Sequence, residues 1–133
     1  MTRPRLLLAD DHEDLLHEVT ALLQGEFDVV GVARDGVALM DIAAHLSPDV
    51  VVTDFRMPGL SGIDAGGTLL ERGLCKAVVL LTIYGDQQLV ESALHAGIQG
   101  FVLKAKAGED LIPAIHSALR GERYVSSPGA APV

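Results

Sequence analysis

Short apolar runs alternate with amphipathic stretches along most of the chain. The runs are rich in Val and Leu, show little polar alternation, and occupy residues 5–9, 27–33, 50–53, 77–82 and 100–103. Runs of this kind are typical of strands that are covered on both faces. Because stretches of helical character separate the runs, the pattern predicts an α/β domain built on a parallel sheet.

The stretches between the runs carry apolar residues at helical spacing. This spacing is clearest in residues 15–23, 36–46, 89–94 and 111–119, and a fifth, weaker segment covers residues 61–73. Five strands and five helices in strict alternation would then fill residues 5 to about 121.

Two helices contain residues that disfavour helical structure. The third contains Gly66 and Gly67, each of which costs about 1 kcal/mol relative to Ala inside a helix, so we expect it to be short or loosened. The last contains Pro113, which lacks a backbone donor and clashes with the preceding turn. We therefore expect Pro113 in the first turn of that helix.

Length and composition indicate a single globular domain. The chain has 133 residues, of which 49% are hydrophobic and 21% charged, which places it among folded domains. Because Cys75 is its one cysteine, the chain cannot form an internal disulfide, and we expect Cys75 to be a small buried hydrophobic residue. Residues 123–133 are rich in Ser, Pro, Gly and Ala, so we expect a domain over residues 1–122 and a linker or tail over 123–133.

The N-terminal sequence and the net charge bear on where the protein is located and on whether it binds nucleic acid. Arg3 and Arg5 precede an apolar stretch, as in a secretory signal, but that stretch ends at Asp10, well short of the roughly seven to fifteen residues required. No run approaches the length of a membrane span, so we predict a cytoplasmic protein without a membrane partner. A net charge of −8 argues against direct nucleic-acid binding, because phosphate affinity comes from clustered Lys and Arg.

Chemically reactive residues stand at the ends of four predicted strands. Asp10 and Asp11 follow the first strand, Asp54 follows the third, Thr82 closes the fourth and Lys104 follows the fifth. Functional groups of a doubly wound sheet gather at the carboxyl ends of its strands, so these side chains should meet. An isolated strand-end Asp is usually a helix cap or a turn residue, but the coincidence of all five favours a functional site.

The combination of side chains indicates phosphoryl chemistry. Three carboxylates in one place repel one another until one takes up a proton or a cation settles among them. Mg²⁺, a hard ion that binds oxygen ligands, would resolve the repulsion and leave positions for water and a phosphoryl oxygen. With the charge of Lys104 and the hydroxyl of Thr82 nearby, one Asp could act as a covalent phosphoryl acceptor.

The histidines give no competing metal site. They are scattered along the predicted helices without the spacing of metal ligands, and we do not expect them to bind a metal: His12, His17, His45, His95 and His116. His12 lies beside the acidic pocket and could tune it weakly.

Four sequence blocks resemble the receiver domain of two-component response regulators. "VVTDFRMPGLSG" (51–62) is similar to the phosphoacceptor strand and loop of that family, and "LLADD", "VVLLT" and "GFVLKA" match its other blocks in order, over residues 4–122. "AIHSALRGERYVSS" (114–127) resembles the end of receivers in the NarL/FixJ subfamily. The resemblance implies the flavodoxin-like receiver fold, a doubly wound five-stranded parallel sheet of order 2-1-3-4-5 with five flanking helices.

The resemblance also implies a phosphoacceptor and its metal ligands. Asp54 would be phosphorylated by the phosphohistidine of a sensor histidine kinase or a phosphotransfer protein. Asp11, Asp54 and the backbone carbonyl of Arg56 would bind Mg²⁺ directly, and Asp10 would hold a coordinated water. Such a domain is a signalling switch rather than an enzyme in the usual sense, although it promotes its own phosphorylation and dephosphorylation.

A conformational switch is implied in the same way. Thr82 and Lys104 would bind the phosphoryl oxygens, and Phe101 would be the aromatic residue that rotates inward as Thr82 moves toward the phosphate. In family terms, the residues flanking the site, Arg56 and Tyr84, control access of hydrolytic water, and the bulk of Tyr84 suggests slow hydrolysis.

The output and two alternatives remain open at this point. The subfamily resemblance implies control of transcription through a DNA-binding domain, for which the chain has no room. We therefore expect the chain to be either a receiver excised from a longer regulator or a stand-alone receiver. A phosphorylation-dependent homodimer is the expected assembly. The alternatives are a haloacid-dehalogenase-like phosphohydrolase, whose DxDx motif "ADDHED" does not match well, and a receiver-like module that has lost phosphorylation.

Overall fold

A computed structural model of the chain describes residues 3–83 and 85–126, which form an α/β sandwich around one sheet. The strands are β1 (Arg5–Ala9), β2 (Asp28–Ala33), β3 (Val50–Thr53), β4 (Ala77–Thr82), β5 (Gly100–Leu103) and β6 (Tyr124–Val125). They pair in the order β2-β1-β3-β4-β5-β6, and every neighbouring pair is parallel. The predicted order of the first five strands is confirmed, and the strand positions agree with the apolar runs to within one residue.

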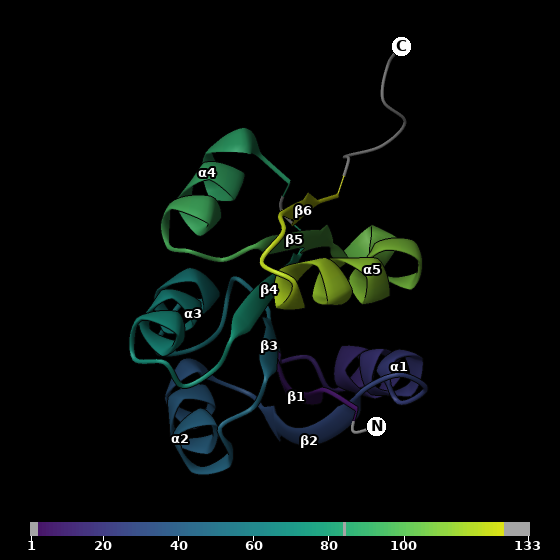
Figure 1. Cartoon of the computed structure of the whole chain (residues 1–133), viewed down its shortest axis with the longest axis vertical. Helices are drawn as coiled ribbons and strands as arrows, with labels where there is room; N and C mark the ends of the chain where they lie inside the picture. Colours follow the sequence, from purple (N-terminus) through teal and green to yellow (C-terminus); the bar gives the residue numbers. More distant parts are fainter. Residues whose placement is uncertain (1–2, 84, 127–133) are drawn as a thin grey trace.

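Five α-helices cover the two faces of the sheet (Figure 1). They are α1 (Glu13–Leu23), α2 (Gly36–Leu46), α3 (Gly62–Glu71), α4 (Gln87–His95) and α5 (Ala107–Leu119), with a 3₁₀ turn, η1 (Lys104–Lys106), before α5. Helices α1 and α5 lie on one face, and α2, α3 and α4 on the other. In the described part of the chain, no helix has the length and apolar character to cross a bilayer.

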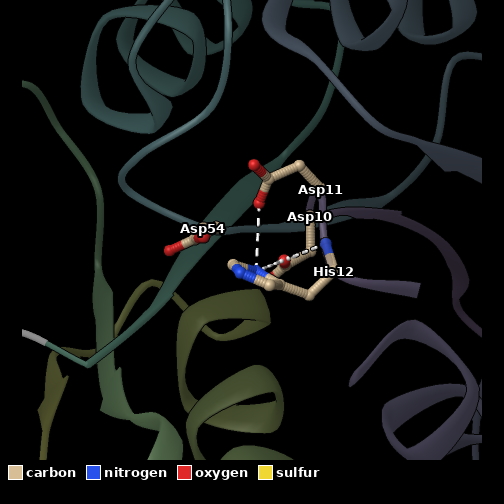
Figure 2. Close-up of side chains that lie close together, drawn as sticks. All are labelled: Asp10, Asp11, His12 and Asp54. Carbon is tan, nitrogen blue, oxygen red and sulfur yellow. Dashed lines mark hydrogen bonds and ion pairs between the residues drawn. The ribbon is translucent and has the colours of Figure 1, made fainter. Parts of the chain in front are cut away.

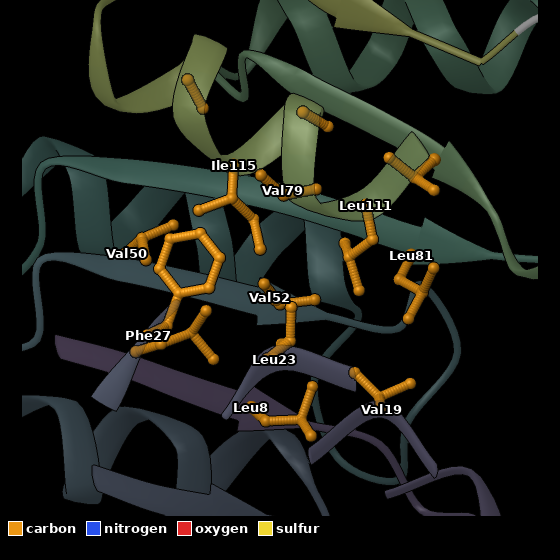
Figure 3. Close-up of a cluster of buried hydrophobic side chains, with 14 of the residues drawn as sticks. Leu8, Val19, Leu23, Phe27, Val50, Val52, Val79, Leu81, Leu111 and Ile115 are labelled. Carbon is orange, nitrogen blue, oxygen red and sulfur yellow. The ribbon is translucent and has the colours of Figure 1, made fainter. Parts of the chain in front are cut away.

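Each face of the sheet has its own apolar core, because successive side chains of a strand point to opposite sides. Leu6 and Leu8 of β1 face α1 and α5, whereas Leu7 faces the other three helices. Figure 3 shows the first core, in which Phe27 and Ile115 are fully buried between the sheet and the helices. Burying a side chain of this size contributes about 2–3 kcal/mol, so the two cores fix the strand ends on which the site depends.

Helix α3 corrects the expectation of a short or loosened helix. It runs unbroken over ten residues despite Gly66 and Gly67. A Cβ at Gly66 would lie 2.9 Å from a methyl group of Val78, and one at Gly67 would lie 3.3 Å from the Cβ of Ala96. The glycines therefore let α3 approach β4 and the end of α4 closely, and this packing outweighs their poor helix propensity.

Helix α5 corrects the expectation for Pro113. The helix begins at Ala107, so the proline lies in its interior and not in its first turn. The sequence pattern missed the first turn because it contains Gly108, Glu109 and Asp110 instead of apolar residues. Tertiary packing compensates for the missing donor, since Leu111, Ala114 and Ile115 are all fully buried.

The region predicted as a linker begins with a strand. Tyr124 and Val125 pair with Gly100 and Phe101 at the edge of the sheet. Asp110 of α5 accepts hydrogen bonds of 2.8 Å from the hydroxyls of Tyr124 and Ser126. The chain is therefore held to the domain as far as Ser126, and residues 127–133 lie outside the described part.

Candidate phosphoryl and metal site

Strand register places the aspartates side by side. Ala9 of β1 and Thr53 of β3 are paired neighbours, so the residues that follow them, Asp10 and Asp54, emerge at the same edge of the sheet. The Asp54 N–H donates to the carbonyl of Ala9 at 2.9 Å, which extends the ladder by one residue. Both aspartates are buried, with 2% and 5% exposure.

Lys104 joins them from the end of β5. Its Nζ lies 2.9 Å from Oδ2 of Asp10 and 3.2 Å from Oδ2 of Asp54. The other oxygen of Asp54 accepts a 2.7 Å hydrogen bond from the N–H of Phe55. One half-buried ammonium thus bridges two buried carboxylates that come from different strands.

The surroundings of the site shift the pKa values of Asp54 and Lys104. Burial raises the pKa of Asp54, and the negative charge of Asp10 raises it further, while Lys104 and the Phe55 N–H act in the opposite direction. Burial alone would lower the pKa of Lys104, but its contacts with Asp10 and Asp54 outweigh that effect and raise it. The ammonium therefore stays charged, and the carboxylates retain an affinity for additional positive charge.

Asp11 and His12 form the exposed half of the site. Nδ1 of His12 lies 3.0 Å from Oδ1 of Asp10 and 3.0 Å from Oδ1 of Asp11, and the His12 N–H donates to the same Asp10 oxygen at 2.9 Å. Figure 2 shows the imidazole reaching both carboxylates. Ligand atoms of Asp10, Asp11, His12 and Asp54 all lie within 4.8 Å of one another.

Asp11, His12, Asp54 and Lys104 line a cavity of about 620 Å³ that opens at the edge of the sheet. Its wall includes the apolar side chains Leu15 and Ile83, with Ile83 67% exposed, and also Arg56. The carboxylate oxygens of Asp10, Asp11 and Asp54 beside this open cavity suit a hard divalent cation that keeps part of its water shell. The donor set therefore fits Mg²⁺.

The loop after Asp54 is shaped by Gly62, the last residue of the "VVTDFRMPGLSG" block. Its N–H donates to the carbonyl of Phe55 at 2.8 Å, and a Cβ at this position would meet the Asp54 carbonyl oxygen at 1.9 Å. Only glycine permits the loop to close this tightly. The closure holds the backbone on both sides of Asp54.

The other predicted residues are placed as follows. Thr82 is fully buried at the end of β4, where it pairs with Leu103, the residue before Lys104. Phe101 is also buried, in the core that faces α2, α3 and α4. Arg56 lines the cavity, and Tyr84 lies outside the described residues.

The sequence placed His12 beside the acidic pocket, as the structure confirms, but it did not predict His12 among the possible metal ligands. Metal-ligand spacing rules look for histidines separated by a turn or a loop, whereas His12 directly follows the two aspartates. The adjacency itself was the available signal, because a residue next to a strand-end acidic pair can turn its side chain back toward them. The apolar wall formed by Leu15 and Ile83 was also not predicted.

Comparisons with known proteins agree with this architecture. Residues 6–116 match the family described as the response regulator receiver domain. The nitrate/nitrite response regulator NarL of Escherichia coli K12 is 34% identical over 91% of this chain, and the match covers 57% of NarL. The chain thus spans little more than half the length of that relative.

Two solved structures share the fold. One is a LuxR-family two-component response regulator from Aurantimonas sp. SI85-9A1, with a TM-score of 0.87 and 27% identity over 94% of this chain and 91% of that one. The other is the isolated receiver domain of RcsB from Salmonella enterica serovar Typhimurium in the presence of the phosphomimetic BeF₃⁻, with a TM-score of 0.84 and 26% identity over 95% of both chains. From its sequence, fold and relatives, the chain belongs to the response regulator receiver domain family, alongside NarL-type and LuxR-family regulators.

Proposed function

We propose that this domain is a phosphorylation-controlled switch in which Asp54 accepts a phosphoryl group from a sensor histidine kinase or a phosphotransfer protein, with Mg²⁺ as cofactor. The observation that carries the proposal is the bridge from Lys104 to Asp10 and Asp54 at the mouth of an open cavity. A half-buried ammonium beside a buried carboxylate is suited to stabilise charge that moves onto phosphoryl oxygens.

The chemistry follows from the positions of the side chains. A carboxylate oxygen of Asp54 forms a bond to phosphorus while the bond from phosphorus to the kinase histidine nitrogen breaks. Lys104, which already lies 3.2 Å from Asp54, pairs with the phosphoryl oxygens, and the Phe55 N–H keeps the carboxylate oriented. When bound by Asp11, Asp54 and the Arg56 carbonyl, with Asp10 holding a coordinated water, Mg²⁺ would neutralise the remaining oxygen charge.

The switch is proposed to pass through the ends of β4 and β5. Movement of the Thr82 hydroxyl toward the phosphate would change the packing next to Leu103, because the two residues are paired. Phe101 lies two residues before Leu103 on β5 and pairs with Leu80 and Val125. A shift from about 1% to 99% active form requires roughly 5.5 kcal/mol, which a few charge-assisted hydrogen bonds to the phosphate can supply.

The output is proposed to be transcriptional control. NarL is named as a response regulator, and the match covers only 57% of it, so the proposed DNA-binding function is assigned outside the part that this chain matches. We further propose that the domain forms a homodimer when it is phosphorylated. The proposed location is the cytoplasm, and this segment is proposed to contact neither nucleic acid nor a membrane directly. Because the receiver domain of RcsB was solved in the presence of the phosphomimetic BeF₃⁻, that anion is a suitable probe of the proposed phosphorylated state.

The decisive experiment is incubation with a small phosphodonor and Mg²⁺, followed by intact-mass measurement and peptide mapping. We expect one phosphoryl group per chain on Asp54, its loss in Asp54→Asn, and its retention in Asp41→Asn, a control on the exposed face of α2. Labelling at another residue, or none with a donor that phosphorylates a known receiver, would reject the proposal. Many turnovers of a generic phosphate ester would instead favour the phosphohydrolase alternative.

A further inference from the structure

His12 occupies a helix-capping position without acting as a cap. It is the N-cap residue of α1, with extended backbone (φ −100°, ψ 111°), and its side chain makes no capping hydrogen bond. Ser, Thr, Asp or Asn at such a position typically stabilises a helix by about 1 kcal/mol, and the N-caps of α2, α3 and α4 are Asp35, Ser61 and Asp86. The side chain of His12 instead turns toward the carboxylates of the site (Figure 2).

The distances around His12 match those between neighbouring ligands of one metal ion. Two ligand atoms at about 2.1 Å from an octahedral ion, in adjacent positions, are roughly 3.0 Å apart, and atoms in opposite positions are roughly 4.2 Å apart. Nδ1 lies 3.0 Å from each of two carboxylate oxygens, the spacing of adjacent ligands, while the group that includes Asp54 spans up to 4.8 Å and would have to contract around an ion. The imidazole thus already sits at ligand spacing from Asp11, on an exposed ring at the rim of the site.

We propose that His12 supplies a nitrogen ligand, through Nδ1, to the cation site proposed above, and that it makes the site selective for divalent transition ions such as Mn²⁺ over Mg²⁺. The inference depends on the cation site of the proposed function, and it adds a ligand that the oxygen-only set lacks. Imidazole nitrogen binds first-row transition ions well, whereas Mg²⁺ binds oxygen almost exclusively. The selectivity therefore resides in this one side chain.

The experiment measures Mn²⁺ and Mg²⁺ binding by the unphosphorylated protein, with His12→Gln as the variant. Free Mn²⁺ is followed by its electron paramagnetic resonance signal, and Mg²⁺ by competition. Gln keeps a polar side chain of similar length and offers oxygen in place of nitrogen. His17→Gln is the matched control, because His17 is an exposed histidine of the same helix.

We expect His12→Gln to weaken Mn²⁺ binding by about tenfold or more and to change Mg²⁺ binding less than about twofold. The spin-echo spectrum of bound Mn²⁺ should show coupling to an imidazole nitrogen in the wild type and in His17→Gln, and none in His12→Gln. Bound Mn²⁺ without nitrogen coupling would overturn the inference. So would an equal loss of both ions, or tighter binding of both, which would mean that His12 competes with the cation.

The same titration separates this inference from the function on which it depends. Asp11→Asn removes a proposed oxygen ligand and should weaken both ions. If neither ion binds to the wild type, the cation site fails, and the proposed function fails with it. If both bind and Asp54 is phosphorylated, but His12→Gln leaves the Mn²⁺ affinity unchanged, only the role of His12 is rejected.

Discussion

Asp54 and Asp110 are two aspartates in one domain with opposite surroundings. Asp110 is half-buried, and each of its oxygens accepts a hydrogen bond from a neutral hydroxyl, of Tyr124 and of Ser126. Asp54 is buried beside a second carboxylate and shares one ammonium with it. The first arrangement satisfies a charge and fixes the chain, whereas the second holds a charge that burial and the neighbouring carboxylate of Asp10 destabilise.

Removing the shared cation should produce the largest effect. In Lys104→Met the stem of the side chain is kept, but Asp10 and Asp54 face each other without the ammonium. Removing one partner of a buried ion pair costs about 3–5 kcal/mol, and we expect about 3 kcal/mol here because Lys104 remains slightly exposed. Urea unfolding without divalent ions measures the loss.

Mg²⁺ sharpens that test. A cation bound only by the folded protein should restore part of the stability of Lys104→Met, and the gain should grow with the logarithm of the Mg²⁺ concentration. Lys106→Met is the control, since Lys106 follows in the same turn and does not line the cavity. A loss of stability equal in the two variants would show that Lys104 is not held by the carboxylates.

Neutralising Asp54 should have a smaller effect of the opposite sign. The pKa of Asp54 is raised above 3.8 by burial and by Asp10, so its charged form destabilises the folded state. Asp54→Asn should therefore be more stable than the wild type at pH 7 without metal. Thermal unfolding in a chelating buffer measures the difference.

The pH dependence of stability tests whether the charge of Asp54 causes the stability difference between Asp54→Asn and the wild type. When the folded pKa is raised, the folded protein binds more protons than the unfolded chain between pH 3.8 and the raised pKa, so stability falls as pH rises through that window. The advantage of Asp54→Asn should be complete above the raised pKa and should vanish as pH falls toward 3.8. An advantage that persists at low pH would mean that the charge of Asp54 is not its cause.

Much of the framework could be predicted from sequence because the physics that sets it is local. Val and Leu runs buried on both faces mark parallel strands, and strand ends mark the site, so Asp10, Asp54 and Lys104 were placed correctly at one edge. Gly66 and Pro113 were misjudged because propensity describes an isolated helix, whereas close packing against Val78 and burial of Ile115 decide the outcome.

The edge of the sheet escaped prediction for a different reason. A strand of only two residues, Tyr124–Val125, has no periodicity to detect, and its hydrogen-bond partner Asp110 is fourteen residues away on a helix. Its composition is that of a linker, and only the three-dimensional pairing with Gly100 and Phe101 makes it a strand. The position of His12 beside the acidic pocket was predicted correctly, but its contact with both Asp10 and Asp11 was not, since that depends on which way one exposed side chain turns.

The smallest effect is expected at the satisfied carboxylate. Asp110→Ala removes the acceptor of Tyr124 and Ser126 and should cost about 1 kcal/mol, because each hydroxyl can bond to water instead. The hydrogen bond to Asp110 is the main cause of the raised pKa of Tyr124, so that pKa should fall toward 10.0 in the variant. Titration followed by ultraviolet absorbance measures the pKa of Tyr124. The transition that disappears in Tyr124→Phe is the one that belongs to this residue.

Hydrogen exchange locates the structural consequence of the same change. Ser126 accepts a hydrogen bond from the Leu103 N–H, one residue before Lys104, so loosening Ser126 should speed exchange at Leu103 as well as at Tyr124 and Ser126. Glu109→Ala, an exposed neighbour in the first turn of α5, should leave those amides protected. If Asp110→Ala speeds exchange throughout α5 rather than along β6, Asp110 stabilises the helix and not the edge strand. Asp110 would then not be the residue that fixes the chain after α5, and that part of its contrast with Asp54 would be rejected.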